Sequence, residues 1–305
     1  RLRYEELHAD ALELAGALVG AGVVKGARVA LLMPNCPDWI VAAFAVGTLG
    51  GVLVPVSTFA TPSERDHILR HSDASILLMQ SSFLKRSYTE ELFESHPELA
   101  SAAAGRIRCE ALPQLRGVFA RTGPTRGAVQ SWDDLMSQGE DVPEALVSEL
   151  CSEVEPSDDA MVIYTSGTTG LPKGINNNHF KLLAIGRAVS QRLGLGCEDR
   201  GYACMPLFHS NALFLGLQPA FAVGASVAIR ERFSASRFLD DVLEHGVTYW
   251  NYVGEPVHYI LGALEKAHGP EPQQIRKCLA GDARKRFRYA MCNGPSPPEL
   301  DRFIH

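Results

Sequence analysis

The segment 164–174, YTSGTTGLPKG, contains the residues whose chemistry is easiest to interpret. It combines hydroxyl side chains with glycines, and Lys173 lies near its end. Glycines allow backbone N–H groups to converge on an anion, hydroxyl groups add hydrogen-bond donors, and the lysine adds positive charge. The segment follows a short apolar run, 161–164, that is typical of a strand. We therefore predict a phosphate-binding loop after a strand; a polar turn without a ligand is the alternative.

The segment does not follow the ordinary P-loop pattern, G-x-x-x-x-G-K-[ST]. Counted from Gly167, the second glycine of that pattern falls on Pro172. Gly174 stands where a Ser or Thr that binds Mg²⁺ should follow Lys173. The sequence therefore disfavours a Walker-type nucleotide triphosphatase.

Residues 164–174 resemble the signature loop of the adenylate-forming superfamily, which includes acyl-CoA synthetases, luciferases and peptide-synthetase adenylation domains. The resemblance extends along nearly the whole chain. FSASRFLDDV at 233–242 and YVGEP at 252–256 make it most similar to very-long-chain acyl-CoA synthetases and fatty-acid transport proteins. It implies that the loop binds the phosphates of ATP. The implied cofactor-binding residues of the loop are Thr165, Ser166, Gly167, Thr168, Thr169, Gly170 and Lys173.

A second stretch, MPLFHSNA at 205–212, contains His209 and Asn211. By residue type alone, a structural histidine is the more common outcome. The resemblance implies that this stretch brings an aromatic or histidine side chain to the carboxylate and the α-phosphate. His209 is therefore the candidate catalytic residue, expected to position the substrate and not to transfer a proton. His209 and Asn211 are both candidate substrate contacts.

A third stretch, TYWNYVGEP at 248–256, is rich in aromatic residues. Aromatic residues are common in strands for packing reasons, so a place in the core is an equal alternative to a ligand contact. A similar stretch lines the acyl tunnel in the fatty-acid branch of the family. The resemblance therefore implies Tyr252, Val253 and Gly254 as substrate-binding residues.

A fourth stretch, MCNGP at 291–295, resembles the adenine-recognition turn of the family. The fatty-acid branch tends to have Gly-Asn-Gly there, and Cys292 replaces the first glycine. The resemblance implies Asn293, Gly294 and Pro295 as cofactor-binding residues. A Gly-Pro turn without a ligand is the alternative.

Composition limits the possible partners. The chain has 305 residues, of which 46% are hydrophobic and 21% charged, enough for a large core and more than one subdomain. A net charge of -6 argues against nucleic acid and against a polybasic membrane surface. The seven cysteines form no C-x-x-C pair, which favours reduced thiols and a cytoplasmic location. The uncharged segment 39–56 contains glycines and a proline, which favours helix, turn and strand over a membrane span but leaves peripheral membrane contact open.

Helical and strand patterns alternate along most of the chain, which predicts an α/β fold with sheets flanked by helices. The expected strands are 28–33, 51–56, 74–79, 161–164, 201–205, 226–230, 248–253 and 289–292. The expected helices are 4–19, 37–47, one opened by 61–64, 178–193, 212–222, 238–245 and 256–266. Between 80 and 154 the pattern weakens, and we expect mainly surface loops with a helix start at 131–134. The acidic segment 153–159 places a boundary between two sheet-containing subdomains, 1–152 and 153–305.

Several motifs of the family do not occur in this sequence. The aromatic-Gly-x-Thr-Glu stretch, whose glutamate helps to hold Mg²⁺, is absent, so we assign no metal ligand. The ribose-binding aspartate, the hinge and the lysine of the small C-terminal domain should follow His305. We therefore expect an incomplete large N-terminal domain without its small C-terminal domain. Such a chain should bind nucleotide weakly or not at all and form no detectable thioester.

The resemblance implies ATP-dependent activation of a carboxylic acid as an acyl-adenylate, followed by thiolysis by coenzyme A. ATP, Mg²⁺ bound with ATP, and coenzyme A are the expected cofactors, and small molecules the only expected partners. The acid is expected to be a long- or very-long-chain fatty acid or a steroid side chain. A non-catalytic nucleotide- or acyl-binding module, or a decayed remnant, is one alternative. An aryl- or amino-acid-adenylating enzyme is another, although Tyr249, Trp250 and Tyr252 indicate an apolar pocket.

Overall fold

The computed structural model describes residues 1–103, 105–165, 170–268 and 288–292. The chain divides into two compact units, Arg1–Lys181 and Leu182–His305. Each unit contains its own sheet. The α/β class with flanking helices, predicted from the alternating pattern, is thereby confirmed.

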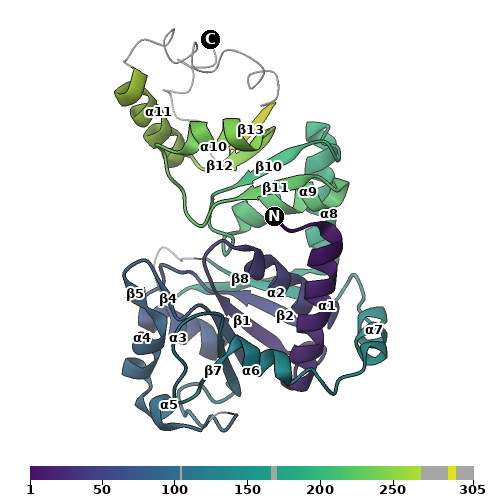
Figure 1. The fold of residues 1–305 in the computed structure, drawn as a ribbon, viewed down its shortest axis with the longest axis vertical. Coiled ribbons are helices and arrows are strands. Elements are labelled where there is room, and N and C mark those ends of the chain that lie inside the picture. Colours follow the sequence, from purple (N-terminus) through teal and green to yellow (C-terminus); the bar gives the residue numbers. More distant parts are fainter. Residues whose placement is uncertain (104, 166–169, 269–287, 293–305) are drawn as a thin grey trace. The chain divides into compact units, whose positions relative to one another are not determined.

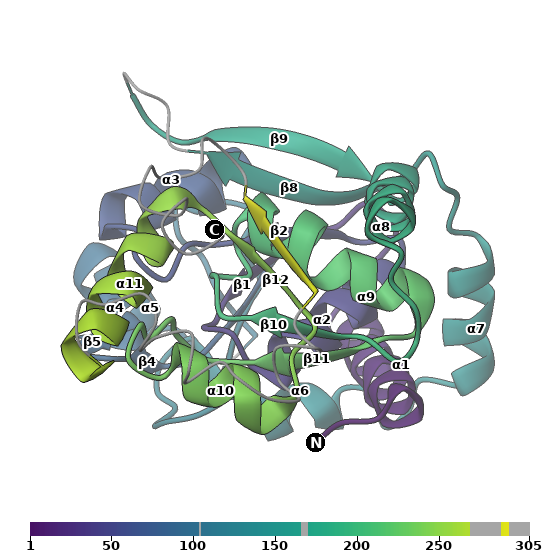
Figure 2. The same ribbon diagram turned by 90° about the horizontal axis from the view of Figure 1, so that it is seen from above.

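The first unit contains a seven-stranded sheet in the order β7-β6-β3-β1-β2-β8-β9. Its strands are β1 (Arg28–Leu32), β2 (Val52–Pro55), β3 (Ile76–Met79), β6 (Gly117–Ala120), β7 (Val129–Ser131), β8 (Asp159–Thr165) and β9 (Lys173–Asn178). Neighbouring strands are parallel, except that β8 and β9 form an antiparallel hairpin, which Figure 2 shows side by side. The parallel strands are short apolar runs because helices cover both faces of the sheet. A separate small hairpin joins β4 (Ser82–Phe83) and β5 (Arg86–Ser87).

Helices of the first unit form two groups (Figure 1). They are α1 (Tyr4–Gly20), α2 (Pro37–Thr48), α3 (Pro62–His71), α4 (Tyr88–Ser95), α5 (Pro97–Ser101), α6 (Trp132–Ser137) and α7 (Glu144–Ser152). Helix α1 contacts α2, α6 and α7, whereas α3 contacts α4 and α4 contacts α5. One buried cluster joins Ala30 and Leu32 of β1 to Ile68 of α3 and Leu92 of α4. The side chains of these helices therefore complete the core on the sheet.

Capping boxes start two of the predicted helices. The Thr61 hydroxyl accepts a hydrogen bond of 3.3 Å from the backbone N–H of Glu64, and the Glu64 carboxylate accepts one of 2.8 Å from the N–H of Thr61. Ser131 and Asp134 form the same arrangement before α6. An N-cap of this kind stabilises a helix by about 1 kcal/mol. Both predicted helix starts are confirmed.

The expectation of mainly surface loops between 80 and 154 is wrong for part of that segment. Residues 117–120 are buried and form β6, which lies between β7 and β3 in the sheet. A run of only four residues is too short to show a period. A Cβ on Gly117 would lie 2.7 Å from the Cε2 atom of Phe119 and 2.9 Å from the Cδ1 atom of Ile76. A larger residue at this position would therefore displace the ends of these two side chains.

The division between the units lies after Lys181, whereas the sequence analysis places it at 152/153. Strands β8 and β9 extend the first sheet, and β9 was not expected because its sequence, KGINNN, is polar. The acidic segment is also fixed to the first unit. Lys25 forms an ion pair of 2.8 Å with Asp158 and donates a hydrogen bond of 2.7 Å to the backbone carbonyl of Glu153. The acidic segment 153–159 therefore forms contacts within the first unit and is not a linker between the units.

The second unit repeats the alternation on a smaller scale. Its elements are α8 (His179–Leu193, which starts in the first unit), β10 (Arg200–Ala203), the π-helix η1 (Ala212–Leu217), α9 (Gln218–Val223), β11 (Ser226–Ile229), α10 (Phe238–His245), β12 (Tyr249–Tyr252), α11 (Gly254–His268) and β13 (Tyr289–Cys292). The sheet has the order β11-β10-β12-β13, and each neighbouring pair is parallel. The carboxyl ends of all four strands therefore lie at the same edge. The expected strands of this part of the chain are confirmed.

At the opposite edge of the second sheet, polar contacts join the amino ends of the strands. The Asp199 carboxylate accepts hydrogen bonds from the Thr248 hydroxyl at 2.7 Å and from the Gly196 N–H at 2.9 Å, and it pairs with Arg288. The polar groups at this edge are therefore hydrogen-bonded or ion-paired with one another. The loops at the carboxyl edge are the part of this sheet that remains for a ligand.

In the described part of the chain, no helix combines the length and the apolar character needed to span a membrane. Five cysteines of the described ranges form no disulfide bond: Cys36, Cys109, Cys151, Cys197 and Cys204.

Candidate functional site

The carboxyl edge of the second sheet has the topology of a ligand site. Strand β10 lies between β11 and β12, so the chain moves outward in opposite directions from β10. In open α/β sheets, ligands bind beyond the carboxyl ends of strands at such a switch point. The loop after β10 contains His209 and Asn211; Val253 directly follows β12, and Gly254 begins α11. The topology brings these predicted residues to the same edge of one sheet.

Asn251 of β12 holds the loop after β10. Its Nδ2 atom donates hydrogen bonds to the Oδ1 atom of Asn211 at 2.5 Å and to the Asn211 backbone carbonyl at 3.1 Å. Both side chains are buried. The Nδ2 atom of Asn211 has no hydrogen-bond partner among the described residues. A buried donor without a partner is rare, and here it suits an acceptor such as a carboxylate or phosphate oxygen.

His209 lies in a turn of the same loop. Its backbone N–H donates to the carbonyl of Pro206 at 3.0 Å, and its ring centroid is 4.5 Å from that of Phe208. Partial desolvation lowers the pKa of His209 below its ordinary value, although the side chain remains partly open to solvent. The imidazole is therefore mainly neutral near neutral pH. A neutral ring offers one donor and one acceptor, which agrees with the predicted positioning role.

Tyr252 and its neighbours lie at the end of β12. The Tyr252 side chain is 3% exposed and stacks on Trp250 with ring centroids 4.9 Å apart. This burial agrees with the alternative of a core residue. Val253 is half-buried and links β12 to α11, which begins at Gly254. Contact of these three residues with an acyl chain stays a prediction.

The signature segment connects β8 and β9 in the first unit. Thr165 and Lys173 are opposite each other in the register, as are Tyr164 and Gly174. Thr165, Gly170 and Lys173 are exposed, and a Cβ built on Gly170 would meet no atom within 4 Å. Within the described ranges, no carboxylate pairs with Lys173. The end of this hairpin therefore offers open space beside a lysine, which fits a phosphate group.

Two histidines of α3 hold the hairpin, and the sequence analysis did not identify them. The Nε2 atom of His67 donates a hydrogen bond of 3.0 Å to the carbonyl of Pro172. The Nδ1 atom of His71 is 2.7 Å from the hydroxyl of Tyr164. Burial raises the pKa of Tyr164, so its hydroxyl stays protonated and shares a hydrogen bond with His71. The spacing of the histidines, i and i+4 on one helix face, was the available signal.

Seven predicted cofactor-binding residues lie outside the described residues: Ser166, Gly167, Thr168, Thr169, Asn293, Gly294 and Pro295. Strand β13 ends at Cys292, so the 293–295 segment directly follows a strand of the second sheet. Their contacts with nucleotide stay predictions.

Comparison with known proteins places this geometry in a family. The family model described as "AMP-binding enzyme" matches residues 1–305. Long-chain fatty acid transport protein 3 of Mus musculus is 30% identical over 285 residues, covering 92% of this chain and 38% of that protein. The medium/long-chain-fatty-acid–CoA ligase FadD17 of Mycobacterium tuberculosis is 42% identical over 143 residues, covering 47% of this chain and 26% of the ligase. The chain thus spans well under half the length of these two relatives.

Solved structures share the fold. The inhibitor-bound N-terminal domain of FACL13 from Mycobacterium tuberculosis superposes with a TM-score of 0.72 at 22% identity, covering 99% of this chain and 65% of that one. At this identity the similarity demonstrates the fold alone. The match of the family model over the whole chain demonstrates more: this chain belongs to the AMP-binding enzyme family, whose members include acyl-CoA synthetases and fatty acid transport proteins.

Proposed function

We propose that this protein activates a long- or very-long-chain fatty acid with ATP, first as an acyl-adenylate and then as an acyl-CoA thioester. Membership of the AMP-binding enzyme family supports the reaction type. Relatives described as a fatty-acid–CoA ligase and a long-chain fatty acid transport protein support the class of acid. The single observation that carries the proposal is the signature hairpin, which presents Lys173 exposed, with no carboxylate partner in the described part of the chain, beside the open position of Gly170.

The signature hairpin would act on the leaving group. A carboxylate resists nucleophiles until one oxygen becomes part of a good leaving group, and ATP supplies AMP for that purpose. Negative charge then develops on pyrophosphate. Lys173 and Thr165 are opposite each other at the end of the hairpin, where the lysine can neutralise that charge and the threonine hydroxyl can donate a hydrogen bond to it. Mg²⁺ would be held by the phosphates of ATP, in line with its preference for oxygen ligands.

His67 and His71 would act through the hairpin as positioning residues. Their contacts with Pro172 and Tyr164 fix both strands just outside the loop. Donors that are held in place before the reaction do not have to reorganise while charge develops. His67 and His71 would therefore hold the loop in a geometry that can stabilise the transition state as well as bind nucleotide.

The loop after β10 would position the acid. The buried Nδ2 atom of Asn211, which has no partner among the described residues, can donate to a carboxylate oxygen. The imidazole of His209 can donate a second hydrogen bond while remaining neutral, since its pKa is lowered. Neither group needs to exchange a proton with the acid. Their role is to orient the carboxylate for attack on the α-phosphate.

The test is acid-dependent exchange of labelled pyrophosphate into ATP. We expect exchange with long-chain fatty acids, and a Lys173→Ala variant should lose roughly 100-fold in rate, the cost of one charge-stabilising donor. Lys85→Ala is the matched control, because Lys85 is also an exposed lysine of the first unit. Equal rates for Lys173→Ala and the parent would contradict the role of the lysine.

A panel of acids tests the substrate class. Long-chain fatty acids, a steroid side-chain acid, aryl acids and amino acids would be compared at equal concentration, each with and without coenzyme A and Mg²⁺. Formation of acyl-CoA from the long-chain acids by the full-length protein is the expected result. Preference for an aryl or amino acid would overturn the assignment of substrate. Nucleotide binding without exchange for any acid would favour a non-catalytic binding module.

A further inference from the structure

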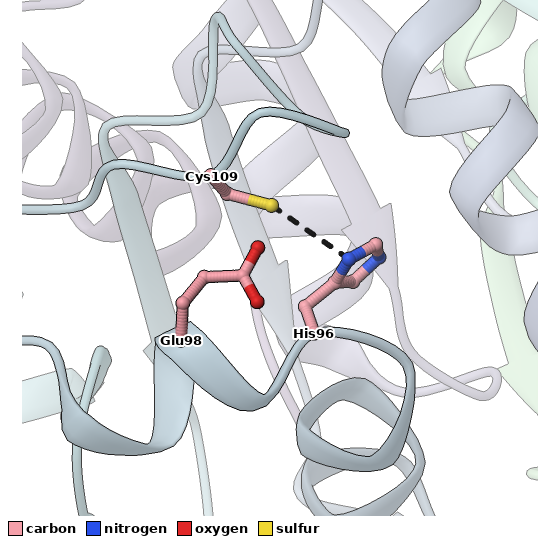
Figure 3. A group of neighbouring side chains, drawn as sticks. All are labelled: His96, Glu98 and Cys109. Atoms are coloured by element: carbon pink, nitrogen blue, oxygen red, sulfur yellow. Dashed lines mark hydrogen bonds between the residues drawn. The ribbon is translucent and has the colours of Figure 1, made fainter.

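Three side chains with metal-binding atoms meet beside α5 (Figure 3). His96 precedes α5, Glu98 lies in its first turn, and Cys109 follows in the chain segment after the helix. The Sγ atom of Cys109 is 3.7 Å from the Nδ1 atom of His96. Ligand atoms of all three residues lie within 4.8 Å of one another. Figure 3 shows the three side chains pointing toward a common point.

The distance between sulfur and nitrogen fits a zinc site. Zn–S bonds of about 2.3 Å and Zn–N bonds of about 2.05 Å at a tetrahedral angle give an S···N separation of roughly 3.6 Å. The observed separation between Cys109 and His96 is 3.7 Å. Little movement of these two side chains is therefore needed. Glu98 is exposed, so its carboxylate can approach by a change of rotamer.

A carboxylate also lies beside the outer nitrogen of this histidine, on the side where a metal-bound histidine usually has its second partner. Its Nε2 atom is 3.2 Å from the Oδ2 atom of Asp66, although the angle is not that of a hydrogen bond. Asp66 is in turn held by Arg65 at 2.7 Å. The carboxylate therefore lies on the side of the ring away from Cys109. This arrangement orients Nδ1 toward the sulfur and favours the tautomer that leaves Nδ1 free to bind a metal.

Burial separates this cluster from an ordinary surface group of acids. His96 is 6% exposed and Cys109 is 5% exposed, whereas Glu98 opens the cluster to solvent. The other metal-like group that the described residues contain is Asp241, Glu244 and His245. There Asp241 already binds Arg230 and the hydroxyl of Tyr202, so a metal would have to displace both. The group at α5 has no such cationic competitor at its ligand atoms among the described residues.

We propose that His96, Glu98 and Cys109 bind one Zn²⁺ ion, with Asp66 as the outer partner of His96. Thiolate, imidazole and carboxylate ligands in tetrahedral geometry favour Zn²⁺ over Mg²⁺ and Ca²⁺, which prefer oxygen ligands. A Zn–S bond replaces the S–H bond of Cys109, and the proton leaves to solvent. Water completes the fourth position. The ion would join α5 to the segment around Cys109, and its binding is independent of the proposed ligase activity.

The test uses the 305-residue chain after removal of metal with a chelator. Titration with Zn²⁺, followed by calorimetry, should give one ion per chain. Titration with Co²⁺ should give the absorption band of a thiolate-to-cobalt charge transfer. Glu98→Gln should weaken Zn²⁺ binding at least about tenfold, since even loss of an outer partner costs about 10- to 100-fold. Cys109→Ser should weaken it at least as much and abolish the Co²⁺ band.

Matched controls separate this site from other zinc-binding groups. Glu94→Gln changes a nearby exposed carboxylate, and Cys151→Ser changes an exposed thiol. Both should bind Zn²⁺ like the parent. Because Glu98 is exposed, Glu98→Gln should fold normally even if Cys109→Ser does not, and circular dichroism would confirm this. Absence of one-to-one binding, or parent-like affinity of Glu98→Gln, would overturn the proposal and leave Cys109 as a thiol hydrogen-bonded to His96.

Discussion

Replacing Asn251 with alanine should loosen the loop that contains His209 and Asn211. The Asn251 amide donates two hydrogen bonds to Asn211, one to its side chain and one to its backbone. Among the described residues, the Asn211 side chain has no other hydrogen-bond partner. Asn251→Ala therefore removes two hydrogen bonds between the loop after β10 and strand β12, while the hydrogen bond from the Tyr249 hydroxyl to the Gly216 carbonyl remains.

The magnitude follows from burial of both partners. Asn251 is 1% exposed and Asn211 is 8% exposed, so water does not readily replace the lost donor. Each hydrogen bond contributes about 1 kcal/mol net, and an acceptor left buried without a donor costs about 1–3 kcal/mol. We expect the second unit to lose about 2–4 kcal/mol of its free energy of unfolding.

Tryptophan fluorescence can isolate this effect. The chain has three tryptophans, and Trp250 is the one in the second unit, next to Asn251. In a background with Trp39→Phe and Trp132→Phe, fluorescence would report unfolding of the second unit alone. Urea titration with linear extrapolation then gives the free energy of unfolding with and without Asn251→Ala.

A double-mutant cycle with Asn211→Ala tests the reasoning directly. If the two side chains interact as described, the coupling energy should be about 1–2 kcal/mol. Acid-dependent pyrophosphate exchange should fall in Asn251→Ala as well, because the loop would no longer be held in place. A loss below about 0.5 kcal/mol, or additive effects of the two substitutions, would refute the importance of this contact.

Two further predictions concern the second unit. Burial raises the pKa of Asp241, but hydrogen bonds from an arginine and Tyr202 outweigh burial and hold the pKa below its ordinary value. The charged carboxylate therefore stabilises the fold above its unfolded pKa, which is about 4. This contribution to stability is lost as the pH falls through the lower pKa of the folded state. Tyr202→Phe should therefore cost about 1.5–3 kcal/mol near neutral pH and progressively less in acid, which urea titrations across the pH range would measure; a pH-independent cost would contradict the charged partner. Gly186→Ala should destabilise by about 1–3 kcal/mol, because its Cβ would lie 2.7 Å from a backbone oxygen at the start of α9. Gly262→Ala, whose Cβ would meet no atom within 4 Å in α11, should stabilise by up to about 1 kcal/mol, and thermal unfolding that ranks the two glycine variants in the opposite order would contradict the packing.

The sequence predicted most elements of both sheets because they carry strong local signals. β1 and β3 are continuous apolar runs, and the helices at Pro37 and Pro62 begin with proline at a first-turn position. β6 and β9 were missed for opposite reasons. β6 is too short to show a pattern, and β9 is a polar edge strand whose partner, β8, decides its conformation.

The candidate site was predictable where it depends on strand direction alone. Because β10 and β12 are parallel neighbours, the stretches that follow them must meet at one edge. The sequence analysis did not identify Asn251, because the local sequence of an aromatic strand does not show which residue its asparagine will contact. Its role depends on the pairing of β10 with β12 and on the turn that buries Asn211. Such contacts between elements are decided by tertiary packing, which local patterns do not encode.

The anchoring of the signature hairpin shows how a local signal can set a distant contact. The Thr61 capping box fixes where α3 begins, and with it the rotation of every later residue about the helix axis. One residue corresponds to about 100° of rotation at 3.6 residues per turn. A start shifted by a single residue would turn His67 and His71 away from Pro172 and Tyr164 together, since they share one face. The geometry of the signature hairpin therefore depends on the register of a helix that the sequence sets more than ninety residues earlier, at Thr61 and Glu64.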